Sequence, residues 1–307
     1  MGLALLFPGQ GTQHPQMLPW LEQEPAAAPL LGPLQAVLGV DWRSRLADPA
    51  WSTSNAVAQP LLVGIELAAW ACLAPLLPAP VAVAGYSVGE LAAFSAAGVL
   101  DAATTFALAQ ARASAMDLSA RTQPLGMAAV HELPLAAILA WCARHGLALA
   151  IRLGPDRAVV GGPVDALLTA AQDPVVASGR VTPIGVKIAS HTPWMRDAVT
   201  AFARTLASIA LRPARAPVAC NLTGAATRQP AELARCLVQQ IAAPVLWDQC
   251  LESVAERGVR CVLEVGPGTT LSAMWRAHAP GIPARSVDEF RSPRAVAEWV
   301  TQTLARG

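Results

Sequence analysis

The strongest sign of chemistry in the sequence is a serine between two glycines, in the segment GYSVG centred on Ser87. An apolar run, Val81–Ala84, precedes the segment, and a helical pattern follows it. Gly-x-Ser-x-Gly between a strand and a helix is typical of a nucleophile elbow, a tight turn that exposes a serine hydroxyl at the carboxyl edge of a sheet. The helix N-terminus beyond the turn would stabilise negative charge that develops there. The alternative is a chance occurrence of the motif in a loop.

A serine nucleophile needs a base, and the sequence offers five histidines. His191 stands out because the segment Ser190-His191-Thr192-Pro193 lies between a predicted strand and a predicted helix, which the proline would begin. A single histidine is more often structural than catalytic. Paired with Ser87, however, His191 is the predicted general base.

A glycine-rich turn, FPGQGTQ at residues 7–13, follows the first predicted strand. It lacks the lysine of a P-loop and the spacing of a dinucleotide-binding fingerprint. A backbone N–H in this turn could form half of an oxyanion hole, with the Val88 N–H as the other half. A plain tight turn is the alternative. Glu90, just after the elbow, is either an acid favoured in the first turn of a helix or a residue that holds the elbow.

Composition excludes several classes of protein. The chain has 307 residues, with 22 basic against 21 acidic residues and 54% hydrophobic residues. This balance argues against a nucleic-acid groove and a polybasic membrane surface, and the hydrophobic content argues against disorder. The six cysteines form no CxxC pair and have no histidine at ligand spacing, so we expect neither a metal site nor a disulfide framework. We expect no metal or redox cofactor.

The most apolar stretch, residues 61–77, raises the question of a membrane span. It carries Glu66 and Pro75, and a lone carboxylate within a span is costly, so we interpret the stretch as a core helix. The N-terminus lacks a basic region and reaches a proline too early for a signal peptide. We therefore expect a cytoplasmic protein that does not enter the membrane.

Short apolar runs alternate with longer alanine-rich helical stretches, which predicts an α/β domain with a parallel sheet. We expect its strands near residues 3–7, 81–84, 217–221 and 259–264, and its helices near residues 61–73, 88–97, 101–119, 194–209, 230–241, 247–257, 269–278 and 293–305. Residues 125–187 instead read β-α-β-β-α-β, the order of a ferredoxin-like unit. The predicted domains are therefore 1–124 with 188–307, and an inserted 125–187. Residues 19–33 are expected to be irregular or a broken helix.

Five motifs together resemble one family. They are FPGQGTQ at residue 7, GYSVGELAAFSAAG around Ser87, Arg112 in the next helix, SHTPWM around His191 and EVGPGTTL at residues 264–271. In this order and spacing they resemble the malonyl-CoA:acyl-carrier-protein transacylases, over essentially the whole chain. The resemblance implies an α/β-hydrolase-like large subdomain with an inserted ferredoxin-like small subdomain. It also implies malonyl-CoA and an acyl carrier protein as partners.

The resemblance further implies the role of each site residue. Ser87 would attack the malonyl thioester with His191 as general base, and the N–H groups of Gln10 and Val88 would hold the oxyanion. Arg112 would pair with the free malonyl carboxylate through its bidentate fork; without the resemblance, Arg112 reads as part of a solvated helix face. The backbone carbonyl of Gln240 would orient His191.

Two positions depart from most of the family. Tyr86 stands where most members have histidine, which is similar to the transacylase (epsilon) subunit of malonate decarboxylase. Ser190 stands where some malonyl-selective members have phenylalanine, so a larger acyl group could enter. We therefore expect malonyl transfer as part of malonate decarboxylase, with the fatty-acid-synthesis transacylase as the alternative. A serine thioesterase or hydrolase and a catalytically idle assembly subunit are the further alternatives.

Overall fold

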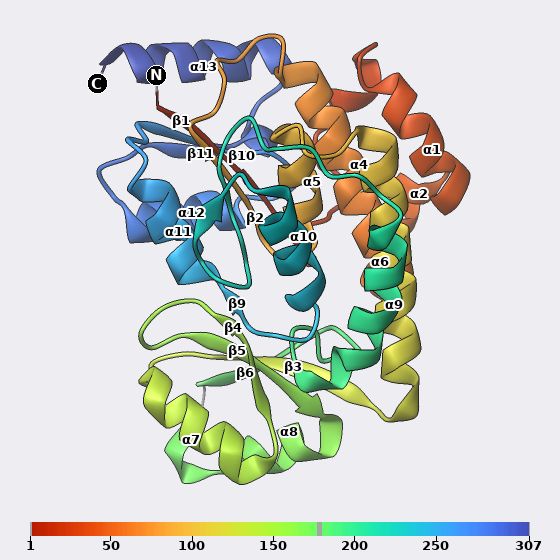
Figure 1. The fold of residues 1–307 in the computed structure, drawn as a ribbon, viewed down its shortest axis with the longest axis vertical. Coiled ribbons are helices and arrows are strands. Elements are labelled where there is room, and N and C mark those ends of the chain that lie inside the picture. The colour runs from red at the N-terminus through yellow and green to blue at the C-terminus, as the bar shows by residue number, and fades with distance from the viewer. Residues whose placement is uncertain (1, 177–179, 307) are drawn as a thin grey trace.

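The computed structural model describes residues 2–176 and 180–306. Two sheets organise the chain, one above the other in Figure 1. Their strands are β1 (Leu3–Phe7), β2 (Ala82–Gly85), β3 (Leu125–Val130), β4 (Ala148–Arg152), β5 (Ala158–Pro163), β6 (Val181–Ile184), β7 (Val218–Ala219), β8 (Ala226–Thr227), β9 (Val245–Leu246), β10 (Cys261–Glu264) and β11 (Ala284–Ser286).

The helices are α1 (Ala28–Leu38), α2 (Trp42–Arg45), α3 (Pro49–Ser52), α4 (Asn55–Leu73), α5 (Gly89–Ala96), α6 (Ala102–Ser119), α7 (Leu135–His145), α8 (Val164–Ala170), α9 (Arg196–Ala207), α10 (Pro230–Gln239), α11 (Trp247–Ala255), α12 (Thr270–His278) and α13 (Pro293–Arg306). The helices from α4 onward lie where the sequence predicts them, whereas α1, α2 and α3 were not predicted. Asp101 caps α6, because its side chain accepts a hydrogen bond from the Thr104 N–H at 2.8 Å.

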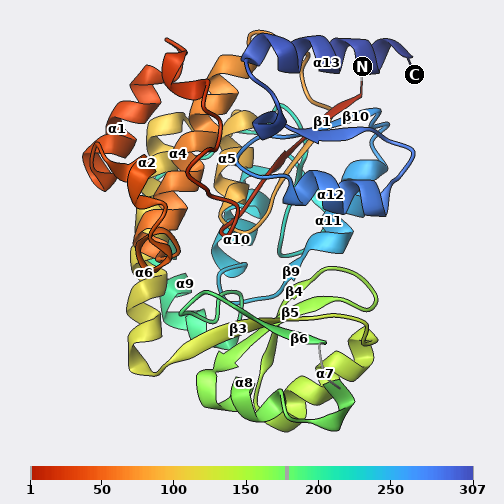
Figure 2. The ribbon, with the colours of Figure 1, turned by 180° about the vertical axis from the view of Figure 1, so that it is seen from behind.

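The large sheet has the order β11-β10-β1-β2-β7-β8, and only β8 runs antiparallel to its neighbour. Alternate residues of β1 enter two different cores: Leu3, Leu5 and Phe7 pack on one face, and Ala4 and Leu6 on the other. Both faces are covered by helices, as a parallel sheet requires. Helices α4, α5, α6 and α9 cover one face, and α11 and α12 cover the other (Figures 1 and 2).

The small sheet has the order β6-β3-β5-β4-β9. Its first four strands are antiparallel and have the predicted β-α-β-β-α-β order, with α7 and α8 on the side away from the large sheet (Figure 1). The fifth strand, β9, comes from outside the range 125–187 and pairs in parallel with β4. We call the large sheet with its helices the large subdomain, and the small sheet with α7 and α8 the small subdomain.

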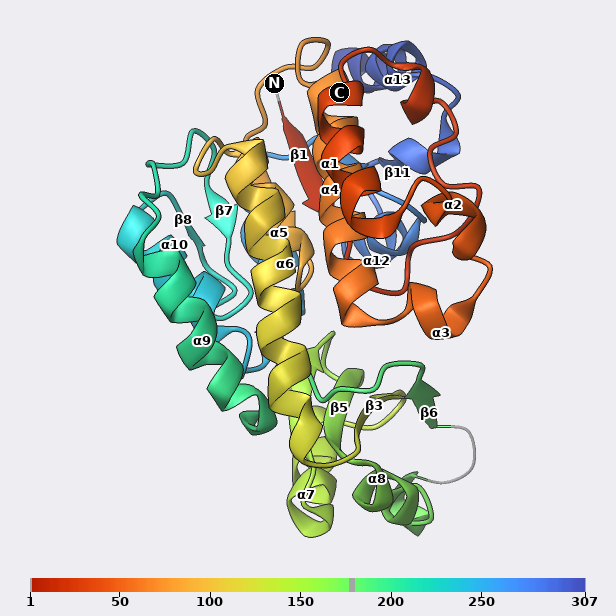
Figure 3. The same ribbon diagram turned by 90° about the vertical axis from the view of Figure 1, so that its right-hand side faces the viewer.

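Two predicted segments differ from the structure. The helix predicted at residues 61–73 begins at Asn55 and holds Pro60 inside it, because burial against neighbouring helices outweighs one lost backbone hydrogen bond. Residues 19–33 contain the start of α1, which continues through Pro33 to Leu38. α4 is long and apolar enough to cross a membrane, yet it lies inside the protein, flanked by α1 and α6 (Figure 3). This is the core helix that the sequence predicts.

Candidate active site

The predicted nucleophile elbow is present at the end of β2. Ser87 has a left-handed φ of 56°, a strained conformation for a serine, and α5 begins two residues later at Gly89. A side chain at Gly85 would overlap the backbone of Gly89 and Glu90, and one at Gly89 would overlap the carbonyls of Phe7 and Pro8. The turn therefore requires glycine at both positions, which explains the Gly-x-Ser-x-Gly spacing.

Ser87 and His191 lie together, although 104 residues separate them. The Ser87 Oγ is 2.7 Å from the His191 Nε2, and the His191 Nδ1 is 2.5 Å from the Gln240 carbonyl oxygen. His191 also has a left-handed φ, 61°, and its backbone N–H donates to the Ile241 carbonyl at 2.9 Å. A ring that donates from Nδ1 to a carbonyl has Nε2 free to accept the serine proton, which suits a general base.

Arg112 projects from α6 to the same point. Its guanidinium donates to the Ser87 Oγ at 3.3 Å and to the Gln59 Oε1 at 2.8 Å, and the side chain is fully buried. The solvated helix face considered as an alternative is therefore wrong. A buried guanidinium beside a nucleophile is suited to bind a substrate carboxylate, because two charged partners of fixed geometry form short, strong hydrogen bonds.

Burial changes the acidity of this group of residues. Desolvation, followed by the charge of Arg112, lowers the pKa of His191 to about 3. Desolvation also lowers the pKa of Arg112 to about 10, against the opposing charge of Glu90. The histidine is thus neutral at pH 7, the form that can accept a proton, while the arginine keeps its charge.

The turn with Gln10 packs directly against the elbow. The Tyr86 N–H donates to the Phe7 carbonyl at 2.8 Å, and a side chain at Gly9 would press on the Tyr86 carbonyl and ring. Within the described part of the chain, no hydrogen bond takes up the backbone N–H of Gln10 or Val88. The structure thus places all six residues predicted for the site on segments that adjoin the elbow, and the role of these two amides as an oxyanion hole stays a prediction.

Two polar residues at the site were not predicted. Gln59, on α4, links Arg112 to the Gln10 side chain, and nothing in its sequence surroundings marks it. Asn221 follows β7, and its Oδ1 accepts from the Ser87 N–H at 2.8 Å. Asn221 could have been predicted from the sequence, because it ends the strand expected at residues 217–221. The carboxyl ends of parallel strands meet at one edge of the sheet, where the elbow also lies.

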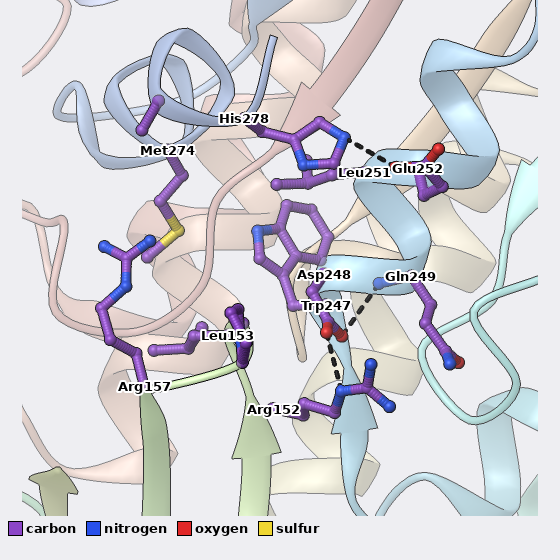
Figure 4. A pocket seen from close by; sticks show the side chains of 13 residues that line it. Arg152, Leu153, Arg157, Trp247, Asp248, Gln249, Leu251, Glu252, Met274 and His278 are labelled. Atoms are coloured by element: carbon purple, nitrogen blue, oxygen red, sulfur yellow. Dashed lines mark hydrogen bonds and ion pairs between the residues drawn. The ribbon is translucent and has the colours of Figure 1, made fainter. Parts of the chain in front are cut away.

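Tyr86, next to the nucleophile, packs against an aromatic ring of α11. Its ring meets that of Trp247 edge to face, with centroids 5.1 Å apart. Trp247 in turn lines a hollow of about 470 Å³ between α11, α12 and the end of β4 (Figure 4). Two ion pairs cross the lining of this hollow, Arg152 with Asp248 at 2.7 Å and His278 with Glu252 at 3.4 Å. Tyr86 is therefore a packing residue that connects the elbow to this hollow.

Within residues 2–176 and 180–306, no three histidine, cysteine or acidic side chains gather closely enough to hold a metal ion. All six cysteines are buried free thiols. The polar groups around Ser87 are those of nucleophilic acyl transfer: a nucleophile, a base, two free amides and a cation.

Comparison with known proteins agrees with this geometry. The family described as "Acyl transferase domain" matches residues 5–282. The "Malonyl CoA-acyl carrier protein transacylase" of Mycobacterium tuberculosis is 37% identical, over 93% of this chain and 96% of its own length. The protein of the same name from Haemophilus influenzae is 30% identical, over 97% of this chain and 98% of its own.

Solved structures agree as well. The crystal structure of MCAT from Mycobacterium tuberculosis is 35% identical, has a TM-score of 0.88, and covers 97% of this chain and 99% of its own. The transacylase structure from Xanthomonas oryzae is 28% identical with a TM-score of 0.88, and covers 98% of each chain. The α/β fold with a large and a small subdomain is thus confirmed.

The fold and the site are those of an acyl transferase. Within that class, the chain belongs to the malonyl-CoA:acyl-carrier-protein transacylase family.

Proposed function

We propose that this protein transfers a malonyl group from malonyl-CoA to the thiol of an acyl carrier protein through a malonyl ester on Ser87. The observation that carries the proposal is the buried guanidinium of Arg112, 3.3 Å from the Ser87 Oγ. A malonyl group has a free carboxylate at one end and the thioester at the other. The guanidinium can bind the carboxylate while the adjacent Ser87 Oγ attacks the thioester. The relatives named above support the same substrate pair.

In the first half-reaction, the Ser87 Oγ attacks the thioester carbon while His191 Nε2 takes the hydroxyl proton. The oxygen of the tetrahedral intermediate becomes negative, and the N–H groups of Gln10 and Val88 stabilise it. The C–S bond then breaks, the CoA thiolate takes the proton from His191, and the malonyl group remains on Ser87. The Gln240 carbonyl holds the imidazole in the tautomer that this exchange needs.

The second half-reaction runs the same steps with the carrier thiol. His191 accepts the thiol proton, the sulfur attacks the malonyl ester, and the Ser87 oxygen leaves with the proton returned by His191. The order is ping-pong, because CoA departs before the carrier thiol arrives.

The substrate carboxylate does more than bind. The charge of Arg112 is one of the causes that lower the pKa of His191. When a malonyl carboxylate neutralises that charge, the imidazole becomes a stronger base. Malonyl-CoA would therefore assist its own acylation, whereas acetyl-CoA, which lacks the carboxylate, would not.

The carrier is most simply that of fatty acid synthesis. The relatives reported above carry the name of the carrier-protein transacylase. A related structure, 26% identical with a TM-score of 0.89, is described as a malonyl-transacylase in complex with a type II PKS acyl-carrier protein, which supports an acyl carrier protein as acceptor without choosing the pathway. The malonate decarboxylase setting rests on Tyr86 alone, and that ring packs on Trp247 without a hydrogen bond to Ser87 or His191 in the described residues. We therefore prefer the alternative setting over the one that the sequence favoured.

The thioesterase alternative makes two demands on the site that the geometry does not meet. It requires an acid partner for His191, and the Nδ1 faces a backbone carbonyl. It also requires no cation for a carboxylate, and Arg112 lies beside Ser87.

A transfer assay tests the proposal. The enzyme is incubated with radiolabelled malonyl-CoA and either the phosphopantetheinylated carrier of fatty acid synthesis or the carrier subunit of malonate decarboxylase. We expect label on the fatty-acid carrier and free malonate at background level. Label on the decarboxylase carrier alone would restore the other setting, and free malonate as the main product would establish a thioesterase.

A further inference from the structure

A second network of hydrogen bonds lies beneath the elbow and is centred on Glu90. This residue is in the first turn of α5 and is fully buried. Its Oε1 accepts from the Asn221 backbone N–H at 2.7 Å, and its Oε2 accepts from the Gln240 Nε2 at 3.0 Å. Each carboxylate oxygen thus has its own donor, from two segments far apart in the sequence.

One arm of the network reaches the nucleophile. The Asn221 side chain accepts from the Ser87 N–H at 2.8 Å and donates to the Gly85 carbonyl at 2.6 Å. These two bonds hold both sides of the turn in which Ser87 has its strained left-handed φ of 56°. Because Glu90 fixes the Asn221 backbone, it indirectly fixes the nucleophile.

The other arm reaches the base. The side chain of Gln240 donates to Glu90, and the backbone carbonyl of the same residue accepts from the His191 Nδ1. A carbonyl orients the imidazole but carries no charge to stabilise the imidazolium that forms when Ser87 gives up its proton. The Glu90 carboxyl group reaches each member of the pair through one intervening residue, Ser87 through Asn221 and His191 through Gln240.

We propose that Glu90 is a positioning residue for catalysis: its buried carboxylate holds Ser87 through Asn221 and His191 through Gln240, and supplies the negative charge that stabilises the imidazolium. Glu90 thus has the electrostatic role of the aspartate in a serine–histidine–aspartate triad. Unlike that aspartate, it acts through an intervening residue, Gln240. This inference rests on the proposed function.

The surroundings of Glu90 allow its charge to be tested by pH. Desolvation raises the pKa of Glu90 to about 7, against the hydrogen bonds from Asn221 and Gln240 and the charge of Arg112. Within the described residues, the ionisable groups that interact with it are Arg112 and the buried thiols of Cys220 and Cys250. His191 lies beyond Gln240. Contact with Cys236, and then burial, raises the pKa of the Cys220 thiol, and burial raises the pKa of Cys250, so both stay neutral. In the free enzyme, the pKa values of His191, about 3, and Arg112, about 10, lie outside the window near pH 7.

The experiment measures single-turnover acylation of Ser87 by saturating malonyl-CoA between about pH 5.5 and 8.5, for wild type and Glu90→Gln. The wild-type rate should rise through pH 7 as Glu90 ionises. Glu90→Gln should lose that rise and be about 10- to 100-fold slower at pH 8, with KM changed less than about twofold. Glu90→Asp, which keeps the charge on a shorter side chain, should recover part of the rate.

Glu66→Gln is the matched control. Glu66 is equally buried, and within the described residues neither of its carboxyl oxygens has a hydrogen-bond partner. Its replacement should leave the acylation rate and the pH profile of wild type intact. Melting temperatures of all variants establish that each is folded.

Rates and pH profiles of Glu90→Gln equal to wild type would overturn the inference. If Glu90→Gln does not fold, Gln240→Ala replaces it, since this change removes the link to Glu90 but keeps the carbonyl that His191 uses. The acylation rate of Gln240→Ala should rise at a higher pH than that of wild type, because Glu90 loses a hydrogen-bond donor that lowers its pKa. A pH profile equal to that of wild type would overturn the inference. The absence of any malonyl ester on wild-type Ser87 would instead defeat the proposed function.

Discussion

Each subdomain contains a histidine whose ring is hydrogen-bonded to an oxygen, a carboxylate oxygen in one subdomain and a backbone carbonyl in the other. In the small subdomain, the His145 Nε2 is 2.9 Å from an Asp173 carboxylate oxygen, which Arg144 also contacts at 2.9 Å. Hydrogen bonds, first from His145 and then from the Val175 N–H and Arg144, hold the pKa of Asp173 below its ordinary value. In the large subdomain, the partners of the His191 ring nitrogens within the described residues are a backbone carbonyl and the Ser87 hydroxyl.

The histidine with the carboxylate is therefore the structural one. His145 ends α7, and its hydrogen bond with Asp173 joins that end of the helix to the residues that follow α8. His191 is fixed by a strained backbone and lies next to a nucleophile. A carboxylate partner does not identify a general base; a serine at hydrogen-bonding distance of the free nitrogen does.

The largest expected effect comes from removing the base. His191→Ala should lower the rate of Ser87 acylation about 10⁶-fold, as loss of a triad histidine does in serine enzymes. His145→Ala should leave that rate within about twofold of wild type, with a small loss of stability. Rapid-quench measurements on both variants make the comparison. Equal losses in the two variants would show that the contrast between the pairs is mistaken.

Removing the carboxylate-binding cation has the next largest effect. Arg112→Ala should lower the ratio of malonyl to acetyl acylation about 100-fold, because the variant loses a buried charge-assisted hydrogen bond that only malonyl forms. Arg144→Ala, in the small subdomain, is the control and should keep the wild-type ratio. Parallel assays with malonyl-CoA and acetyl-CoA give both ratios, and an unchanged ratio in Arg112→Ala would exclude the carboxylate-binding role.

A smaller effect is expected where the small subdomain touches the site. A side chain at Gly161, on β5, would come within 3.2 Å of the Ala189 and Thr192 side chains, on either side of His191. Gly161→Val should displace His191 and slow acylation about 10-fold without unfolding the chain. A Cβ at Gly154 meets no atom within 4 Å, so Gly154→Val is the matched control. A wild-type rate in Gly161→Val would show that the small subdomain leaves the position of His191 unaffected.

The smallest effect concerns stability. Desolvation, and then the neighbouring Glu264, raises the pKa of Glu66 well above its ordinary 4.5, so the folded protein prefers the neutral carboxyl. Wild type should lose stability as the pH rises from about 4.5 through the raised pKa of Glu66. Glu66→Gln, which is always neutral, should melt a few degrees higher than wild type at pH 8, which corresponds to roughly one or two kcal/mol in the free energy of unfolding. Near pH 4 it should melt at the same temperature as wild type. Scanning calorimetry at both pH values measures the difference; an equal shift at both would contradict it.

Local signals explain why much of the site could be predicted from sequence. The elbow at Ser87 is specified by two glycines, because a side chain at either position would collide with the backbone. The helix α6 begins after a capping aspartate, Asp101. Short strands such as β9 have no such signal, because two residues become a strand only by pairing with β4 from another part of the chain. Gln59 has no local signal for the same reason, since its role comes from its contact with Arg112, a residue distant in the sequence.

Tyr86 shows a different limit. The residue type drew attention to a biological setting, but its position against Trp247 is explained by packing. A sequence departure beside a nucleophile is therefore weak evidence for a change of partner. The small Ser190 is a parallel case, and the roomier acyl site that it suggests stays a prediction.

The most direct test of the account is to locate the acyl group during turnover. Wild type is mixed with malonyl-CoA, quenched and digested, and the peptides are analysed by mass spectrometry before and after addition of the phosphopantetheinylated carrier. We predict an increase of about 86 Da, one malonyl group in ester linkage, on the peptide that contains Ser87, its disappearance when the carrier is added, and no adduct in Ser87→Ala. An adduct on another residue, or none on wild type, would contradict the account.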